Sequence, residues 1–204
     1  MIWAVVLAAG KSERMGSPKM LLPFGRKTVI ESVVAGLLKS NVDGIVVVLG
    51  ACRGEIGRKL RSYPVSPVYN PDFERGMLSS VERGLAELPG EARGALIVLG
   101  DQPSIPASVI DRVIDVFKSG GKGIVVPSYR GRRGHPAIID LKYRQEIETL
   151  DPAVGLRQLM LRHPGDVLEV AVRTPRILKD IDRPEEYREL ISLKKSVRSR
   201  GRKP

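Results

Sequence analysis

The sequence predicts an α/β fold in which helices cover both faces of a mostly parallel sheet. Short apolar runs alternate with amphipathic stretches along the chain, which is the pattern of β-α-β units. Several of these runs carry no polar residue, as central parallel strands do when helices bury both of their sides. Neither a linker nor a shift in composition interrupts residues 1–193, so we expect a single three-layer domain over that range.

Short apolar segments are expected to form the strands of this sheet. The last of them alternates apolar and polar residues, which is typical of a strand with one side in water. The segments are residues 3–7, 45–49, 65–69, 95–99, 124–127 and 137–139, followed by the alternating Leu168, Val170 and Val172.

Amphipathic segments between these strands are expected to form helices. The first begins at a capping box, because Thr28 and Glu31 stand three residues apart at the start of an apolar face. The expected helices cover residues 28 to about 39, 54–60, 77–88, 107–117, 142–150, 154–162 and 184 to about 194.

The net charge of +11 is unevenly spread along the chain. Residues 194–204 hold six Lys and Arg and no acidic residue, which leaves +5 for residues 1–193. A flexible basic tail is one interpretation of this segment, and an arm for nucleic acid is another. Because aromatic residues make up only 4% of the chain, we expect no specific nucleic-acid partner. The surplus over residues 1–193 suits an anionic small molecule.

The sequence shows no targeting signal and has no second cysteine with which Cys52 could pair. No stretch is long and apolar enough for a membrane span, and Met1 leads directly into the first strand without a signal peptide. We therefore expect a cytoplasmic protein with no membrane partner. Cys52 is the only cysteine, so it forms no internal disulfide and is interpreted as a structural residue.

A loop of small residues follows the first strand. Ala8, Ala9 and Gly10 leave backbone N–H groups accessible to phosphate oxygens, and Arg14 and Lys19 bring two cations to the same edge of the sheet. The loop lacks the spacing of a Walker phosphate loop. These residues together predict a triphosphate site.

Further loops are expected at the same edge, because ligands of open α/β sheets bind beyond the carboxyl ends of the strands. Asn70 follows the third strand, and Gly100 and Asp101 follow the fourth. A carboxylate at a strand tip is a ligand that Mg²⁺ prefers. The alternative is that Asp101 is a turn residue, since Pro103 comes soon after it.

Ordered segments over residues 2–190 resemble those of the molybdenum-cofactor nucleotidyltransferases, in particular the cytidylyltransferase (MocA-like) branch of the MobA-like NTP transferase family. The first and fourth segments are typical of a wider superfamily that includes sugar-phosphate enzymes, whereas the third and fifth point to the cytidylyltransferase branch. The segments are Leu7-Ala8-Ala9-Gly10-Lys11-Ser12-Glu13-Arg14-Met15-Gly16, Lys19-Met20-Leu21-Leu22-Pro23-Phe24, Asn70-Pro71 through Gly76-Met77-Leu78-Ser79-Ser80-Val81, Leu99-Gly100-Asp101-Gln102-Pro103, Gly131-Arg132-Arg133-Gly134-His135-Pro136 and Asp180-Ile181-Asp182-Arg183-Pro184-Glu185.

The resemblance implies a Rossmann-like nucleotidyltransferase fold and a reaction that uses Mg²⁺. A nucleoside monophosphate would pass from an NTP to a phosphate-bearing acceptor, and pyrophosphate would leave. Arg14, Lys19 and Asp101 would be catalytic, since the cations stabilise the departing pyrophosphate. The acceptor phosphate is itself the nucleophile, so no side-chain base is required. The implied nucleotide-binding residues are Leu7, Ala8, Ala9, Gly10, Lys19, Asn70, Ser79, Ser80 and Gly100.

The choice of base is expected to depend on the first loop. Relatives that use CTP resemble Leu-Ala-Ala-Gly there, whereas those that use GTP resemble Leu-Ala-Gly-Gly, and this chain has Ala9. We expect its methyl group to narrow the pocket and so disfavour a purine. One methyl group in a pocket contributes about 1–3 kcal/mol to such discrimination. Asn70, Ser79 and Ser80 would hydrogen-bond to base or ribose, unless they serve as turn and helix-capping residues.

A second glycine-rich turn is implied to bind the acceptor. It holds Arg132, Arg133, Gly134 and His135, whose positive charge and flexibility suit a phosphate, although a solvated hairpin is the alternative. The implied acceptor is molybdopterin, which would receive CMP on its terminal phosphate. A molybdoenzyme or its chaperone would then take the finished cofactor.

The acceptor remains open because of one departure from the family pattern. Family members commonly carry Asp two residues before Gly155, where this chain has Ala153. Transfer to a sugar or polyol phosphate is therefore an alternative. Transfer from GTP to molybdopterin is a second alternative, which concerns the nucleotide and not the acceptor. A non-catalytic nucleotide-binding protein is a third.

Two further aspartates are candidates for the metal. Asp180 and Asp182 stand two residues apart, so an extended segment points both carboxylates to one side, where they would join Asp101. Asp182 also opens a capping-box-like sequence, in which Arg183 replaces the Thr usual in the family. That pattern favours Asp182 as a helix cap and Asp180 as the metal ligand.

Overall fold

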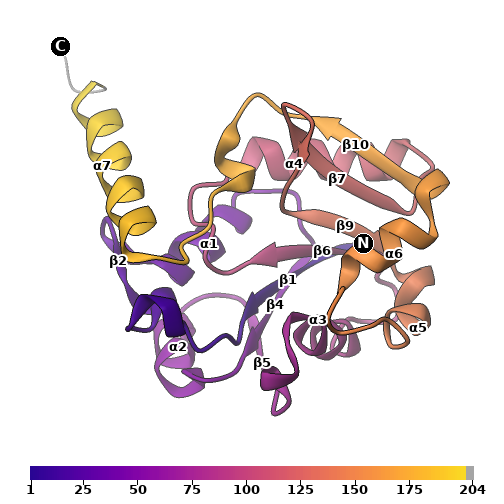
Figure 1. Cartoon of the computed structure of the whole chain (residues 1–204), viewed down its shortest axis with the longest axis horizontal. Helices are drawn as coiled ribbons and strands as arrows, with labels where there is room; N and C mark the ends of the chain where they lie inside the picture. The colour runs from indigo at the N-terminus through magenta and orange to yellow at the C-terminus, as the bar shows by residue number, and fades with distance from the viewer. Residues whose placement is uncertain (201–204) are drawn as a thin grey trace.

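The computed structural model describes the backbone of residues 1–200 and the side chains of residues 1–192. Its centre is one sheet with the strand order β10-β7-β9-β6-β1-β4-β5, and β8 pairs with β7 beside this path (Figure 1). The strands are β1 (Ile2–Ala8), β4 (Gly44–Leu49), β5 (Ser66–Tyr69), β6 (Gly94–Leu99), β7 (Ile124–Tyr129), β8 (Arg132–Arg133), β9 (Ala137–Asp140) and β10 (Val167–Ala171).

The sheet is mostly parallel, as the sequence predicts. β1 pairs in parallel with β4 and with β6, β4 with β5, and β7 with β10. β9 is antiparallel to both of its neighbours, and β8 is antiparallel to β7. The carboxyl ends of the parallel strands β1, β4, β5 and β6 therefore open at one edge of the sheet.

Helices cover both faces of the sheet (Figure 1). One face packs against α1, α2 and α4, and the other against α3, α5 and α6. The helices are α1 (Val29–Leu37), α2 (Arg53–Leu60), α3 (Met77–Ala86), α4 (Ala107–Ser119), α5 (Arg144–Ile147), α6 (Leu156–Arg162) and α7 (Pro184–Arg200).

The alternation of side chains along β1 produces the two hydrophobic cores. Ala4 and Val6 face the core under α1, whereas Val5 and Leu7 face the core under α3. All of these side chains are buried because a helix lies over each side of the strand. The three-layer α/β class predicted from the apolar runs is confirmed.

A third, smaller cluster attaches α7 to the rest of the molecule. Ile181 and Leu190 pack with Met15, Phe24 and Val29, next to the small sheet formed by β2 (Pro23–Phe24) and β3 (Lys27–Thr28). The hydroxyl of Tyr187 donates a hydrogen bond to the carbonyl of Pro23, at 2.6 Å. The chain just before α7 is thereby held beside the loop that follows β1.

Two predicted helices differ in extent from the structure. The segment 142–150 forms a 3₁₀ turn (Leu141–Tyr143) and then only the short α5, since Asp140 accepts a hydrogen bond from the backbone of Lys142 and starts the turn. The last helix does not end near residue 194 but continues to Arg200. The remainder of the predicted tail, residues 201–204, lies outside the described residues, and the domain boundary at residue 193 stays a prediction.

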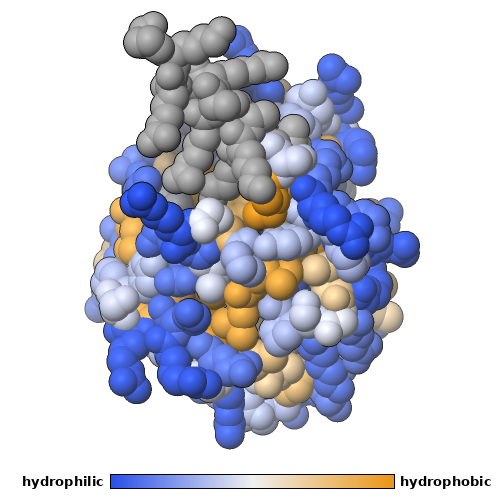
Figure 2. All heavy atoms as spheres, turned by 90° about the vertical axis from the view of Figure 1, so that its left-hand side faces the viewer, coloured by the Kyte–Doolittle hydropathy of each residue, from blue (hydrophilic) through white to orange (hydrophobic). Residues whose placement is uncertain are grey.

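The face that carries α7 is mixed in character. Hydrophilic residues make up most of its outline, and hydrophobic residues gather near its middle (Figure 2). Across residues 1–200, no helix is both long and apolar enough to cross a bilayer.

Candidate active site

Segments distant in sequence meet at the carboxyl edge of the parallel strands. The loop after β1 leads into two 3₁₀ turns, Glu13–Met15 and Lys19–Leu21, and Asp101 is the second residue after β6. Between η6 (Pro175–Leu178) and α7, Asp180 and Asp182 flank the buried Ile181. The apolar anchor formed by Ile181 thus holds both aspartates at this edge.

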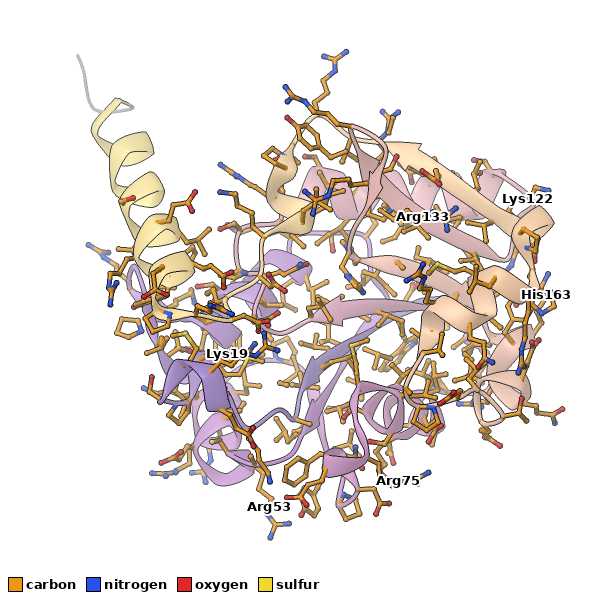
Figure 3. All side chains as sticks on the ribbon, in the orientation of Figure 1. Lys19, Arg53, Arg75, Lys122, Arg133 and His163 are labelled. Atoms are coloured by element: carbon orange, nitrogen blue, oxygen red, sulfur yellow. The ribbon has the colours of Figure 1, made fainter. Side chains whose placement is uncertain are left out.

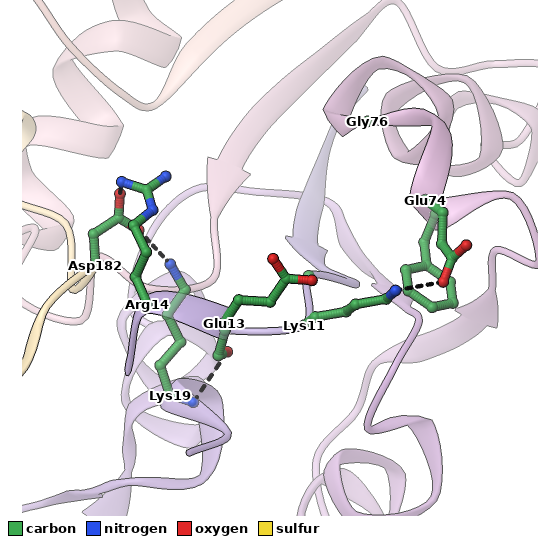
Figure 4. A pocket seen from close by; sticks show the side chains of 10 residues that line it. Lys11, Glu13, Arg14, Lys19, Glu74, Gly76 and Asp182 are labelled. Atoms are coloured by element: carbon green, nitrogen blue, oxygen red, sulfur yellow. Dashed lines mark hydrogen bonds and ion pairs between the residues drawn. The ribbon is translucent and has the colours of Figure 1, made fainter. Parts of the chain in front are cut away.

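Lys19 joins two of the carboxylates. Its Nζ lies 2.6 Å from Oδ2 of Asp101 and 2.7 Å from Oδ1 of Asp182. Nη1 of Arg14 lies 3.1 Å from the other oxygen of Asp182 (Figure 4). Arg14, Lys19 and Asp101, which the sequence predicts to be catalytic, therefore meet in one ion-pair network with Asp182.

The carboxylates form a group with the donor set of a divalent cation site. One oxygen from each of Asp101, Asp180 and Asp182 lies within 4.8 Å of the others. The second oxygen of Asp101, Oδ1, is buried and has no hydrogen-bond partner among the described residues. A buried acceptor normally has a partner. Carboxylate oxygens are the preferred ligands of Mg²⁺ and Mn²⁺, so these residues fit a hard divalent ion.

The surroundings shift the pKa values of this cluster in opposite directions. Burial raises the pKa of Asp101, although Lys19 acts against this effect. Burial also raises the pKa of Asp180, and the nearby charges of Asp101 and Asp182 add to the effect. The hydrogen bond from Lys19 lowers the pKa of Asp182. Burial alone would lower the pKa of Lys19, but Asp101 and Asp182 outweigh it and raise that pKa.

The expectation that Asp182 caps the last helix is wrong. The backbone N–H groups of Asp182 and Arg183 both donate to Oε2 of Glu186, each at 2.8 Å. Glu186 therefore satisfies the start of α7, and the carboxylate of Asp182 is available to Lys19 and Arg14. Cap and site ligand are provided by different residues.

A pocket of about 690 Å³ opens beside this cluster. One wall is the loop after β1, and the opposite wall is the turn before α3, which includes Phe73, Glu74 and Gly76 (Figure 4). Nζ of Lys11 and Oε1 of Glu74 form an ion pair across the pocket, at 2.5 Å. The pocket is lined by Gly10, Lys11, Ser12, Glu13, Arg14, Lys19, Phe73, Glu74, Gly76 and Asp182.

Several of these lining residues were not predicted to be site residues. Lys11 had a signal, because it is a cation directly after Gly10 in the small-residue loop. Glu74 had none, since a single acidic residue in a turn is ordinary. Only the fold brings it opposite Lys11.

Close backbone packing supports the loop after β1. A Cβ at Gly50 would lie 2.3 Å from the carbonyl oxygen of Ala9 and 2.8 Å from its Cβ. A Cβ at Gly100 would lie 2.8 Å from the carbonyl oxygen of Leu7. The methyl group of Ala9 is buried against Gly50, and Ala9 is not among the residues that line the pocket. An effect of this methyl group on the size of the base pocket stays a prediction.

Asn70, Ser79 and Ser80 form a buried network with each other. Nδ2 of Asn70 donates to the hydroxyls of Ser79 at 3.0 Å and Ser80 at 3.1 Å, and Oδ1 accepts from the backbone N–H of Asp72. The hydroxyl of Ser79 also lies within hydrogen-bond distance of the carbonyls of Asp72 and Gly76. These contacts join β5 to the start of α3, and contact with base or ribose stays a prediction.

The predicted acceptor loop is divided by the structure. Arg132 and Arg133 lie on the exposed β8, and Nε of Arg133 pairs with Oε1 of Glu169 at 2.7 Å, away from Lys19 (Figure 3). Gly134 packs so closely on Ile177 that a Cβ would lie 2.3 Å from the carbonyl oxygen of that residue.

His135 lies close enough to Asp180 for the charge of that carboxylate to affect its pKa. It is half-buried, and burial lowers its pKa while the charge of Asp180 acts in the opposite direction. His135 thus interacts with one residue of the carboxylate group, whereas Arg133 pairs with Glu169. An acceptor-binding role for this loop stays a prediction.

Comparison with known proteins places this geometry in a family. Residues 4–167 match the MobA-like NTP transferase domain. The chain is 26% identical over 184 residues to the molybdenum cofactor cytidylyltransferase of Escherichia coli K12, which covers 90% of this chain and 92% of that protein. It is 28% identical over 197 residues to the nicotine blue oxidoreductase of Paenarthrobacter nicotinovorans, with coverages of 93% and 96%.

Solved structures agree with this comparison. Rv0371c of Mycobacterium tuberculosis H37Rv superposes with a TM-score of 0.85 at 30% identity, over 94% of this chain and 97% of that one. A second structure of Rv0371c, in complex with manganese, has a TM-score of 0.79 at 29% identity, over 94% and 98% of the chains. From the family match over residues 4–167, together with these full-length similarities, the chain belongs to the MobA-like NTP transferase family and has its nucleotidyltransferase fold.

Proposed function

We propose that this nucleotidyltransferase transfers CMP from CTP to the terminal phosphate of molybdopterin and releases pyrophosphate. The observation that carries the proposal is the group of Asp101, Asp180 and Asp182 beside Lys19 and Arg14, at the end of a pocket. Carboxylates for a divalent ion next to cations for phosphates are the two parts that phosphoryl and nucleotidyl transfer need. An oxidoreductase, as one relative is named, would not require this combination.

Each part of the site has a role in this reaction. The triphosphate would lie in the pocket, where Arg14 and Lys19 neutralise the charge that develops on the departing pyrophosphate. Asp101, Asp180 and Asp182 would hold Mg²⁺, which when bound polarises the phosphate oxygens. The terminal phosphate of the acceptor attacks the α-phosphorus, and the bond to the β-phosphate oxygen breaks. Holding the two phosphates in line supplies much of the rate.

The choice of CTP and molybdopterin as substrates is based on sequence similarity and not on residues that line the pocket. The E. coli relative is named a molybdenum cofactor cytidylyltransferase and aligns with 90% of this chain. The first loop also resembles the sequence of the CTP-using members, and Ala9 would act by holding the loop against Gly50.

A sugar or polyol phosphate is a second candidate acceptor. The observation that favours it is Ala153, which stands where family members commonly carry Asp. In the structure the backbone N–H of Ala153 donates to Asp151 in an exposed turn, so position 153 offers no side-chain hydrogen bond to a pterin. The nucleotide half of the reaction would be unchanged.

Pyrophosphate release tests the proposal. The purified protein is mixed with Mg²⁺, molybdenum cofactor and CTP, GTP or ATP in turn, and release is expected with CTP. Asp101→Asn keeps the shape of the side chain but removes its charge, and we expect at least a 10³-fold loss, since metal and phosphates are no longer held. Asp115→Asn, at an exposed carboxylate on α4, is the matched control and should keep full activity.

The outcomes separate the parts of the proposal. Release with GTP alone would contradict the choice of base. Release with a sugar or polyol phosphate but not with molybdenum cofactor would contradict the acceptor. Equal activity of Asp101→Asn and the parent chain would contradict the site itself.

A further inference from the structure

The ammonium group of Lys19 contacts two of the three carboxylates that would hold a metal ion. Its Nζ is within hydrogen-bond distance of Asp101 and Asp182. One carboxylate oxygen of each of these residues lies within 4.8 Å of one from Asp180. The side chains of Lys19 and Asp101 are only 13% and 12% exposed, so water screens this pair weakly. A protonated lysine therefore compensates the charge of the carboxylates in the absence of a metal.

Each Lys or Arg that lines the pocket is already paired with a carboxylate. Lys11 pairs with Glu74, Arg14 with Asp182, and Lys19 with Asp101 and Asp182. A triphosphate gains these cations only by taking them from carboxylates. Asp101 and Asp182 then lose their partner at a half-buried or buried position, which is unfavourable unless another cation replaces it.

We propose that Lys19 is the resident cation of the metal site, which a divalent ion must displace before it binds. This inference rests on the proposed function and states what regulates metal binding at the same site. When Mg²⁺·NTP enters, the ion replaces Lys19 on Asp101 and Asp182, and the ammonium of Lys19 moves to the phosphates. Metal and nucleotide therefore bind cooperatively, and the metal alone binds weakly.

The geometry of Lys19 permits this exchange. Its side chain lines the pocket as well as contacting the carboxylates, so the ammonium has the phosphate site within its reach. Lysine has a flexible stem and a compact charge, which suits a group that changes partners. The ammonium of Lys19 and a metal ion would compete for the same carboxylate oxygens, and they repel each other because both are cations. The unfavourable interaction between the two cations is lost when Lys19 leaves the carboxylates, so any change that removes Lys19 from them strengthens metal binding.

Binding of Mn²⁺ alone tests this exchange. The concentration of free Mn²⁺ is followed by electron paramagnetic resonance during titration of the full chain, with neither nucleotide nor acceptor present. Lys19→Met is expected to bind Mn²⁺ at least tenfold more tightly than the parent chain. Lys19→Gln, whose amide still reaches the carboxylates without a charge, is expected to fall between them.

Two variants serve as controls. Lys11→Met removes another pocket lysine whose partner, Glu74, lies outside the carboxylate group, and it should change the Mn²⁺ affinity less than twofold. Asp101→Asn should abolish the Mn²⁺ site in either background. If Lys19→Met is poorly folded without metal, Mn²⁺ should raise its melting temperature more than that of the parent chain.

Mn²⁺ affinity that is equal or weaker in both Lys19 variants would overturn the inference, as would an equal gain in Lys11→Met. Failure of the proposed function is a separate result. A chain that releases no pyrophosphate from CTP but binds Mn²⁺ more tightly after Lys19→Met would retain the exchange and lose the proposed substrates.

Discussion

Asn70 illustrates how a polar side chain with an apparent binding role is used inside the protein. It is 2% exposed, and its amide contacts two serine hydroxyls and a backbone N–H. This arrangement satisfies groups that burial would otherwise leave unpaired. The network fixes the turn that carries Glu74 and Gly76 to the pocket, so its role in binding would be positioning.

Replacement of Asn70 should therefore lower stability. We expect Asn70→Ala to reduce the free energy of unfolding by about 2 kcal/mol, because partners of the lost amide remain buried. Urea unfolding measures the effect. Asn41→Ala, at an exposed position, is the control and should change it by less than about 0.5 kcal/mol. A stable Asn70→Ala variant with weakened CTP binding would show instead that Asn70 reads the nucleotide.

Glycines determine how closely α3 approaches the sheet. A Cβ at Gly84 would lie 2.3 Å from Cγ1 of Val5 and 3.0 Å from Cγ2 of Val48. No side chain fits there, so the helix packs directly on β1 and β4. In α2, a Cβ at Gly57 would meet only Cδ1 of Leu49, at 4.0 Å. Glycine is therefore required for close packing at position 84 of α3 but not at position 57 of α2.

The two glycines predict opposite signs for one substitution. Gly84→Ala should lower the free energy of unfolding by about 1–3 kcal/mol, because the added methyl overpacks the core. Gly57→Ala should raise it by about 0.5–1 kcal/mol, since alanine favours a helix. Thermal and urea unfolding of both variants measure the difference. A stabilising Gly84→Ala would contradict the close packing of α3.

At the scale of the whole molecule, one cluster joins the turn after β9 to the segment before the edge strand β10. Asp166, just before β10, accepts a hydrogen bond from the hydroxyl of Tyr143 and pairs with Lys142 at 2.7 Å. Burial alone would raise the pKa of Asp166, but the hydrogen bonds from Lys142 and Tyr143 outweigh it and lower that pKa well below the ordinary 3.8. The cluster lies at the opposite end of β7 and β10 from the site.

This depressed pKa predicts a pH dependence. Because the folded pKa is below the unfolded one, the stabilisation is complete above about pH 4 and is lost as the pH falls through the folded value. Asp166→Asn should lower the free energy of unfolding by about 1–2 kcal/mol at pH 7, and the difference should shrink below pH 4. Urea unfolding across pH tests this, with Asp115→Asn as the control that shows neither effect. A difference that is constant down to pH 2 would contradict the assignment.

Local patterns in the sequence predicted most of the elements correctly. Apolar runs marked β1, β4 and β6, and Thr28 and Glu31 marked a capping box that is present at α1. The rule that strand ends meet at one edge was sufficient to place Asp101 near Lys19, 82 residues away. The extent of α5 was missed because Asp140 starts a 3₁₀ turn in the segment predicted to be helical, and the end of α7 was predicted too early.

The sequence by itself determined the α/β class, the phosphate-type loop after β1 and the residue types available for the site, because these depend on periodicity and on short motifs. Only the tertiary structure decided which partner each side chain has. Asp182 pairs with Lys19 because Glu186 caps α7 and Ile181 anchors the chain, while Arg133 turns to Glu169. Such pairings join residues far apart along the chain, and packing and burial select them, so no local pattern encodes them.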